Sequence, residues 1–368
     1  MIFLTGGTGY LGGYVLLDLL ARTDGDVALL VRAPDDEAAV AKLWKGLQLH
    51  IDWGQYQELL RRVRFCPGDL HAPGLGLSED HREMLLNEAD SVLHVAASLN
   101  RKSAKACLNT NLRGTLSVIK LARDIANRSG LLRYSHVSTV AVAGQRSREI
   151  VEEDSAIEWD RSDYDPYGRT KKFCEHMAHE LLEDLPRNIF RPSVVMGDTR
   201  HARTTQFDMV RATCLMADLP AVPLAPTDRV DIVPADWVSE VISTVHLDPE
   251  PEHIIYHCSA GRDAVTAEQI CQALEAATGR RPRLSPRLER PFDWAFRAMN
   301  RLPRGNAVQA TGALMKVFMP YITYDTVFAN ERASSAVGAA PTSFRDYGVP
   351  LYKWAKSMNF QFPYAPVP

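Results

Sequence analysis

The sequence predicts an α/β protein with a doubly wound parallel sheet and a smaller C-terminal part that is interleaved with it. Two observations predict this fold class. Short apolar runs alternate with amphipathic helical stretches through the first half of the chain, as parallel strands joined by crossover helices require. A glycine-rich turn also joins the first apolar run directly to the first helical stretch, which is the strand–turn–helix setting of a dinucleotide site.

The expected elements follow one another along the chain. Expected strands cover 2–5, 26–31, 62–66, 91–95, 132–138 and 187–191, and expected helices lie near 10–21, 36–48, 79–88, 102–127 and 164–184. Beyond residue 192 the pattern loosens, and it predicts a strand over 230–233, a helix over 237–247, a strand over 254–257 and a helix over 267–278. We therefore expect a nucleotide-binding domain over 1–198 with a return segment near 229–259, and a substrate-binding part over 199–228 and 260–368.

The composition excludes several other classes of protein. The chain has 368 residues, of which 46% are hydrophobic, and a net charge of -3, so it is too apolar for a disordered chain. With 42 Lys+Arg against 45 Asp+Glu, we expect no nucleic-acid partner. No apolar run approaches the ~18 residues of a membrane span. Six separated cysteines and no secretory leader favour reduced thiols and a cytoplasmic location.

The turn at the start of the chain is the first candidate site. Its glycines can be aligned as G-x-G-x-x-G or as G-x-x-G-x-x-G. Glycine lets the backbone approach a pyrophosphate that a Cβ would exclude, and the helix N-terminus that follows offers free N–H groups. The pattern therefore predicts a bound dinucleotide that is contacted by Thr5, Gly6, Gly7, Thr8, Gly9, Tyr10, Leu11 and Gly12.

Arg32 indicates which dinucleotide is bound. An NAD site places an acid about 20 residues beyond the turn, where it holds the ribose 2′-hydroxyl. Arg32 stands at that spacing, at the end of the second expected strand, and its cation suits a 2′-phosphate. We therefore expect NADP(H) to be preferred over NAD(H). The alternative is that Arg32 only leaves the sheet and that Asp35 or Asp36 supplies the acid.

A second candidate site combines two neighbouring elements. Tyr167 and Lys171 lie four residues apart on an expected helix, so they share one face. A neighbouring ammonium is expected to lower the pKa of Tyr167 from about 10, which suits proton exchange with a carbonyl or alcohol oxygen. Ser138 and Thr139 end the preceding strand, where a hydroxyl can hold a substrate oxygen as negative charge develops. The alternatives are a solvated surface helix and an ordinary turn cap.

Taken together, these motifs resemble the extended short-chain dehydrogenase/reductases, whose nucleotide-binding domain is Rossmann-type. The resemblance covers roughly residues 1–260. It implies that Tyr167 is the acid/base, that Lys171 binds the nicotinamide ribose and tunes Tyr167, and that Thr139 polarises the substrate oxygen. Four shorter stretches agree with the family, and they add these cofactor contacts: Asp69, Leu70, Ala96, Ala97, Asn111, Pro192, Ser193 and Val194, beside Tyr167 and Lys171 themselves.

One branch of that family is most similar. The stretches 29–33, 68–78 and 231–234 look like thioester reductases and fatty acyl-CoA reductases. That likeness implies NADPH-dependent reduction of an acyl thioester, on CoA or a carrier protein, to an aldehyde and sometimes an alcohol. We expect no adenylation or carrier domain ahead of Met1, and therefore a substrate that is recruited from solution. The alternatives are a ketone or hydroxyl on a hydrophobic molecule such as a sterol, flavonoid or polyketide-like compound, a nucleotide-sugar epimerase or dehydratase, and a non-catalytic nucleotide-binding scaffold.

Some further features have less specific interpretations. His176 and His179 suit a solvated helix face better than a metal site, and no metal is expected. The apolar run 313–322 fits a pocket wall, a membrane contact or a core helix, and Arg229 is a candidate substrate contact. An arginine-rich segment fits either a dock for CoA phosphates, phosphopantetheine, an acidic carrier protein or anionic lipid, or a solvated loop; it contains Arg280, Arg281, Arg283, Arg287, Arg290, Arg297, Arg301 and Arg304.

Overall fold

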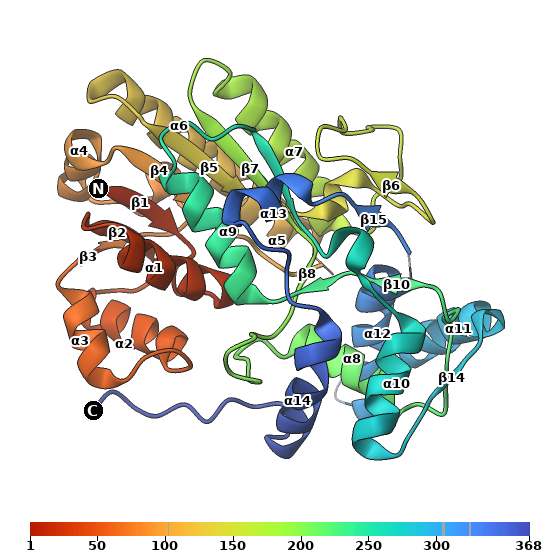
Figure 1. The fold of residues 1–368 in the computed structure, drawn as a ribbon. Coiled ribbons are helices and arrows are strands. Elements are labelled where there is room, and N and C mark those ends of the chain that lie inside the picture. The colour runs from red at the N-terminus through yellow and green to blue at the C-terminus, as the bar shows by residue number, and fades with distance from the viewer. Residues whose placement is uncertain (102, 304–305, 324) are drawn as a thin grey trace.

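A parallel sheet of seven strands forms the centre of the computed structural model, which describes residues 1–101, 103–303, 306–323 and 325–368. The strand order is β3-β2-β1-β4-β5-β7-β12, and every neighbouring pair is parallel. This order contains the 3-2-1-4-5-6 arrangement of a doubly wound Rossmann fold, so the predicted fold class is confirmed (Figure 1). The strands are β1 (Ile2–Thr5), β2 (Val27–Val31), β3 (Val63–Pro67), β4 (Ser91–His94), β5 (Arg133–Val137), β7 (Arg187–Pro192) and β12 (Ile255–Cys258).

Helices cover both faces of the sheet because the strands alternate their apolar side chains. In β1, Leu4 packs into the cluster on one face and Phe3 into the cluster on the other. The first face is covered by α1 (Tyr10–Arg22), α2 (Asp36–Leu47), α9 (Ala235–Leu247) and α13 (Glu331–Val337). The second face is covered by α4 (Glu79–Glu88), α6 (Gly114–Arg128) and α7 (Pro166–Leu181).

The structure differs from the expected elements in several places. Helix α3 (Trp53–Leu60), which begins with a capping box from Asp52, was not expected because Gly54 interrupts its short pattern. The expected helix near 102–127 is broken into α5 (Ala104–Cys107), a π-helical turn (Leu108–Arg113) and α6, and Lys102 lies outside the described residues. Such π turns occur mostly as local insertions in α-helices, often at functional sites.

The expected strand over 230–233 is two short strands that have different partners. The strand β10 (Arg229–Val230) pairs with β13 (Val265–Thr266), whereas β11 (Ile232–Val233) pairs with β8 (Val194–Val195). Asp231 lies between them, and its carboxylate accepts a hydrogen bond of 2.8 Å from the Ala260 amide. That contact ties the junction of the two short strands to the segment after β12.

A second group of helices lies beside the carboxyl edge of the sheet (Figure 1). It is built around two apolar clusters of its own. Among the described residues, no helix combines the length and apolar character that crossing a membrane requires. These helices are α8 (Asp208–Asp218), α10 (Ala267–Thr278), α11 (Glu289–Met299), α12 (Ala307–Thr323) and α14 (Phe344–Ser357), and the accompanying short strands are β6 (Ile150–Val151), β9 (Ala221–Val222), β14 (Arg283–Leu284) and β15 (Val327–Phe328).

The C-terminal tail returns from α14 to the side of the molecule where α2 and α3 lie (Figure 1). Gln48, at the end of α2, donates to the Ala365 carbonyl at 2.8 Å and accepts from the Ala365 amide at 2.8 Å. Lys45 lies over the Tyr364 ring, 4.7 Å from its centroid. The tail therefore fastens the last part of the chain to α2.

A buried ion pair joins α7 to the sheet. Arg191 of β7 donates from Nε to the Glu175 carboxylate at 3.0 Å, and both side chains are almost fully buried. Arg191 also contacts the His257 ring in β12 at 3.2 Å, and Glu175 accepts from the Ser138 hydroxyl at 2.7 Å. Because either charge alone would be costly at this depth, the pair fixes α7 against β5, β7 and β12.

Replacing Glu175 tests this pair. Glu175→Ala leaves the Arg191 charge buried without its partner, so we expect the free energy of unfolding to fall by about 3–5 kcal/mol. Urea denaturation followed by circular dichroism measures it. The matched control is Glu180→Ala on the same helix, since the Glu180 side chain is 65% exposed, and its effect should stay within about 0.5 kcal/mol. Equal losses in the two variants would contradict the role of the pair.

Candidate active site

A cavity of about 570 Å³ runs along the carboxyl edge of the sheet. Its wall includes residues that follow β1, β2, β3, β4, β5 and β7, so it crosses the sheet at the point where the strand order reverses. That crevice is where open α/β sheets bind ligands. Helices α8 and α12 add Asp208, Met209, Phe318 and Tyr321 to the wall. The cavity therefore lies between the sheet and the second group of helices.

The glycine turn forms the wall next to β1. Gly6 has φ +85°, and a Cβ there would lie 2.6 Å from the Ala96 nitrogen, while a Cβ at Gly12 would lie 2.0 Å from the Gly6 oxygen. No side chain caps the first turn of α1, whose N-cap is Gly9. Its N–H groups can therefore hold an anion, as a pyrophosphate requires. This observation fits a dinucleotide cofactor.

Most residues expected at the turn line the cavity, but two do not. Gly6, Thr8, Gly9, Tyr10, Leu11 and Gly12 form part of its wall. Thr5 points instead to the buried ring of His94, with 2.7 Å between Oγ1 and Nδ1. Gly7 faces Leu29 and Leu4, where a Cβ would come within 2.6 Å of a Leu29 methyl group. Thr5 and Gly7 therefore pack behind the turn and support it.

Two cations lie at the end of the cavity next to β2. Arg32 and Lys42 both line it, and Lys42 Nζ donates to the Arg32 carbonyl at 3.0 Å. Burial and the nearby charge of Arg32 lower the pKa of Lys42. Asp35 caps α2 by accepting from the Ala38 amide at 2.8 Å. Neither Asp35 nor Asp36 is part of the cavity wall.

Thr139 and Tyr167 both line the cavity. The Thr139 hydroxyl accepts a hydrogen bond from the Ala141 amide at 3.3 Å, and the Thr139 side chain acts to lower the pKa of Tyr167. Lys171 also lines the cavity, but its Nζ donates to the Val137 carbonyl at 2.6 Å and lies 3.5 Å from the His136 ring. The structure therefore brings Thr139, Tyr167 and Lys171 together, with the ammonium directed at β5.

The pKa of Tyr167 departs from the sequence-based expectation. Burial raises it to about 12, and the cation that acts to lower it is Arg101. The expected lowering below 10 by Lys171 is therefore wrong for this structure. Desolvation outweighs the nearby charges, and the Lys171 ammonium is occupied by the Val137 carbonyl. The same burial lowers the pKa of Lys171.

Arg101, which lies in the loop after β4, was not expected from the sequence. Its guanidinium carbon is 4.9 Å from the centroid of the Tyr167 ring, 4.8 Å from that of Tyr321 and 5.3 Å from that of Phe318. No periodicity or motif marks Arg101, because the loop carries neither. Two of the three rings come from α12, which is more than 200 residues away in the chain.

Asp165 connects these groups. Its Oδ1 accepts from the Gly168 amide at 2.9 Å and so caps α7. Its Oδ2 accepts from the Tyr321 hydroxyl at 2.8 Å and lies 3.4 Å from Arg101 Nε. A single carboxylate thus holds the start of α7, the loop after β4 and α12.

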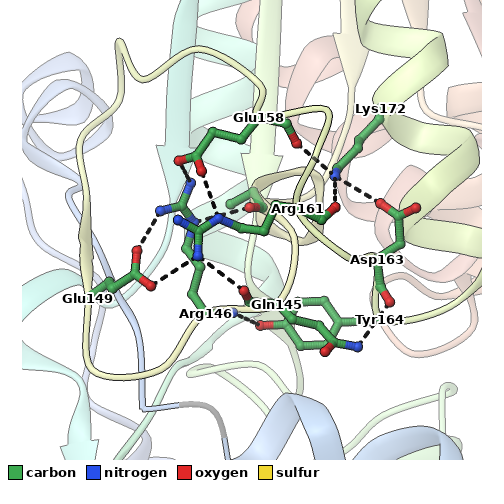
Figure 2. A network of polar contacts seen from close by, with 9 residues as sticks. Gln145, Arg146, Glu149, Glu158, Arg161, Asp163, Tyr164 and Lys172 are labelled. Atoms are coloured by element: carbon green, nitrogen blue, oxygen red, sulfur yellow. Dashed lines mark hydrogen bonds and ion pairs between the residues drawn. The ribbon is translucent and has the colours of Figure 1, made fainter.

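A network of charged side chains braces the segment that leads into α7. Figure 2 shows Arg146 and Arg161 converging on the carboxylates of Glu149 and Glu158. Lys172 of α7 pairs with Asp163 at 2.9 Å and donates to two backbone carbonyls of the same segment. The network fixes the segment from Gly144 to Asp165, so Tyr167 begins its helix at a defined place.

The remaining expected cofactor contacts fall into two groups. Asp69, Leu70, Ala96, Ala97, Pro192, Ser193 and Val194 line the cavity. Asn111 is buried behind the wall, where it accepts from the Ser98 amide at 2.7 Å and donates to Thr170 at 3.2 Å. It ties the loop after β4 to α7. Arg229 does not line the cavity.

The other sequence features are placed as follows. Within the described part of the chain, no three His, Cys, Asp or Glu side chains gather as a metal would need. Phe318 and Tyr321, from the apolar run 313–322, face the cavity. In the arginine-rich segment, Arg280, Arg281 and Arg297 form ion pairs, and Arg304 lies outside the described residues. In the described part of the chain, no residue of this arginine-rich segment lines the cavity.

Known proteins of similar sequence match about three-fifths to two-thirds of this chain. A linear gramicidin synthase of Brevibacillus parabrevis is 33% identical over 251 residues, which are 66% of this chain and 5% of that protein. Fatty acyl-CoA reductase wat of Drosophila melanogaster is 28% identical over 239 residues, which are 58% of this chain and 46% of that protein. The chain therefore spans less than half the length of either relative.

A solved structure and a family model extend the comparison. The terminal R domain from the myxalamid PKS-NRPS biosynthetic pathway superposes with a TM-score of 0.83 at 24% identity, over 98% of this chain and 91% of that one. This likeness shows the fold. The model of the NAD-binding family described as "Male sterility protein" matches residues 4–242. The chain therefore belongs to that family, and it folds as an extended short-chain dehydrogenase/reductase that binds a nicotinamide cofactor.

Proposed function

We propose that this protein reduces an acyl thioester, on CoA or on a carrier protein, to the aldehyde with NADPH. The observation that carries the proposal is that Thr139, Tyr167 and Lys171 line one cavity that also contains an uncapped helix N-terminus. Similarity to a protein named a fatty acyl-CoA reductase supports a thioester as the substrate.

The reaction needs one hydride and one proton. The reduced nicotinamide, when bound, supplies the hydride to the thioester carbonyl carbon. The hydroxyls of Thr139 and Tyr167 hold the carbonyl oxygen, and Tyr167 gives it a proton. The resulting hemithioacetal then loses its thiol, so that one thioester yields one aldehyde and one free thiol. The high pKa of Tyr167, about 12, keeps the phenol protonated at neutral pH, as an acid must be.

We assign the cofactor contacts from the wall of the cavity. Asp69 and Leu70 are assigned to the adenosine half and Ala96, Ala97, Pro192, Ser193 and Val194 to the nicotinamide half, with Lys171 at its ribose. The pyrophosphate is assigned to Gly6, Thr8, Gly9, Tyr10, Leu11 and Gly12, all of them in the wall. Thr5, Gly7 and Asn111 act indirectly, since each packs behind that wall.

NADPH rather than NADH is the proposed donor. Arg32 and Lys42 present two cations at the β2 end of the cavity, and the acids considered for the NAD alternative, Asp35 and Asp36, lie outside the wall. Two cations suit a 2′-phosphate, because hydrogen bonds to charged groups are stronger than neutral ones.

A cytoplasmic location is part of the proposal. The six free, buried cysteines support it, because thiols stay reduced in that compartment.

A thioester assay tests the reaction. Purified protein with NADPH and a panel of acyl-CoAs should consume cofactor and release free thiol in equal amounts. Tyr167→Phe should lower turnover by about 10²–10⁴-fold, because it removes the proton donor, and should leave the Kd for NADPH unchanged. A control variant, Tyr56→Phe, alters a tyrosine outside the cavity and should keep full turnover.

Two other outcomes of that assay would replace the proposal. NADPH consumed on a ketone panel, without thiol release on any thioester, would identify a ketone reductase. Tight NADPH binding with no turnover on either panel would identify a nucleotide-binding scaffold.

The cofactor preference is tested at Arg32 and Lys42. Each of Arg32→Ala and Lys42→Ala should raise the Kd for NADPH by about 10–100-fold, the equivalent of one charged hydrogen bond, while changing the Kd for NADH little. Fluorescence titration of each cofactor measures both constants. Arg61→Ala is the control, since Arg61 is 74% exposed at the end of α3. Equal losses of NADPH and NADH affinity would overturn the preference.

A further inference from the structure

Arg101 is a largely buried cation that has no role in the reaction proposed above. Its side chain is only 15% exposed and lies in the wall of the cavity beside Tyr167. Its Nε makes no hydrogen bond within the described structure. An arginine in such a place is costly unless its surroundings favour the charge. The three aromatic rings and the Asp165 carboxylate around it do so.

The groups that face Tyr167 come from four elements. The loop after β4 brings Arg101, the end of β5 brings the Thr139 hydroxyl, and α12 brings Tyr321. Helix α7 itself contributes Asp165, Lys171 and Cys174. The Lys171 ammonium is bound by the Val137 carbonyl, which leaves Arg101 as the described cation that lies over the phenol ring.

We propose that Arg101 is a positioning residue for Tyr167: stacked between that ring and the α12 rings of Phe318 and Tyr321, it supplies the positive charge that makes the phenol an effective acid. The inference rests on the proposed function, because it assigns Tyr167 the proton-transfer step. Its direction agrees with the pKa of Tyr167, which Arg101 lowers against the effect of burial.

The chemistry of arginine suits this place better than that of lysine. A guanidinium is planar, so it can stack on several rings at once, and it stays charged at any pH a protein tolerates. A buried lysine loses its charge much more readily, as the lowered pKa of Lys171 illustrates. Charge at this point therefore requires an arginine.

The experiment measures the acidity of the phenol directly and without substrate. A fluorinated tyrosine at position 167, incorporated alone by codon suppression, is titrated by ¹⁹F NMR in the full-length protein with NADP⁺ bound. In Arg101→Gln the titration midpoint should move up by about 1–3 pH units, the effect of removing an opposite charge at this distance. The matched control is Arg211→Gln. The Arg211 guanidinium lies over the Phe360 ring, 5.2 Å from its centroid and outside the cavity, so its removal should leave the titration midpoint unchanged.

Turnover gives the second readout. With the natural tyrosine, Arg101→Gln should lower kcat on an acyl-CoA by about 10–100-fold, leave the Kd for NADPH unchanged, and regain much of kcat when the more acidic fluorotyrosine replaces Tyr167. A residue that only maintained the fold would not give this rescue. Arg101→Met, which keeps the packing of the stem, replaces the Gln variant if circular dichroism shows that variant to be unfolded.

The outcomes separate the two proposals. An unchanged midpoint in the folded Arg101 variant overturns the role of Arg101, whatever the substrate is. A shifted midpoint in a protein whose parent reduces no acyl-CoA supports the role of Arg101 and overturns the proposed thioester substrate instead.

Discussion

The arrangement of the side chains around Tyr167 depends on the contacts of the Asp165 carboxylate. One of its oxygens caps α7, which fixes where Tyr167 and Lys171 begin their helix, and the other accepts the Tyr321 hydroxyl of α12 beside Arg101. Tyr321 is 156 residues away in the chain. The same side chain thus sets a local cap and a tertiary contact, and losing it would release α7, the loop after β4 and α12 together.

Burial at the site has opposite effects on its two titrating residues. Desolvation raises the pKa of Tyr167 to about 12 and lowers that of Lys171, so both side chains are pushed toward their neutral forms. Different partners offset the desolvation of the two side chains. The Val137 carbonyl holds the Lys171 ammonium, whereas Arg101 and Thr139 favour the phenolate of Tyr167.

The parts of the site that the sequence predicts are those built from local spacing. The glycine turn, the strand end at Thr139 and the helix of Tyr167 and Lys171 each lie within a few residues, and the alternation of apolar runs is enough to predict the sheet. Arg101 and Tyr321 meet only through the tertiary fold, and no periodicity records such a contact. The pKa of Tyr167 was misjudged for a related reason: spacing shows which charges are near, but it does not show how deeply they are buried.

Helix α12 combines two roles that are separate in many sites. Phe318 and Tyr321 shape the wall of the cavity, and the same rings hold the Arg101 guanidinium over Tyr167. A substitution that widens the pocket at either position therefore also removes a ring that contacts Arg101. The contacts proposed for the pyrophosphate and the 2′-phosphate come from the turn after β1 and from Arg32 and Lys42, and they include neither ring. In the proposed reaction, substrate range and proton transfer are therefore coupled through α12.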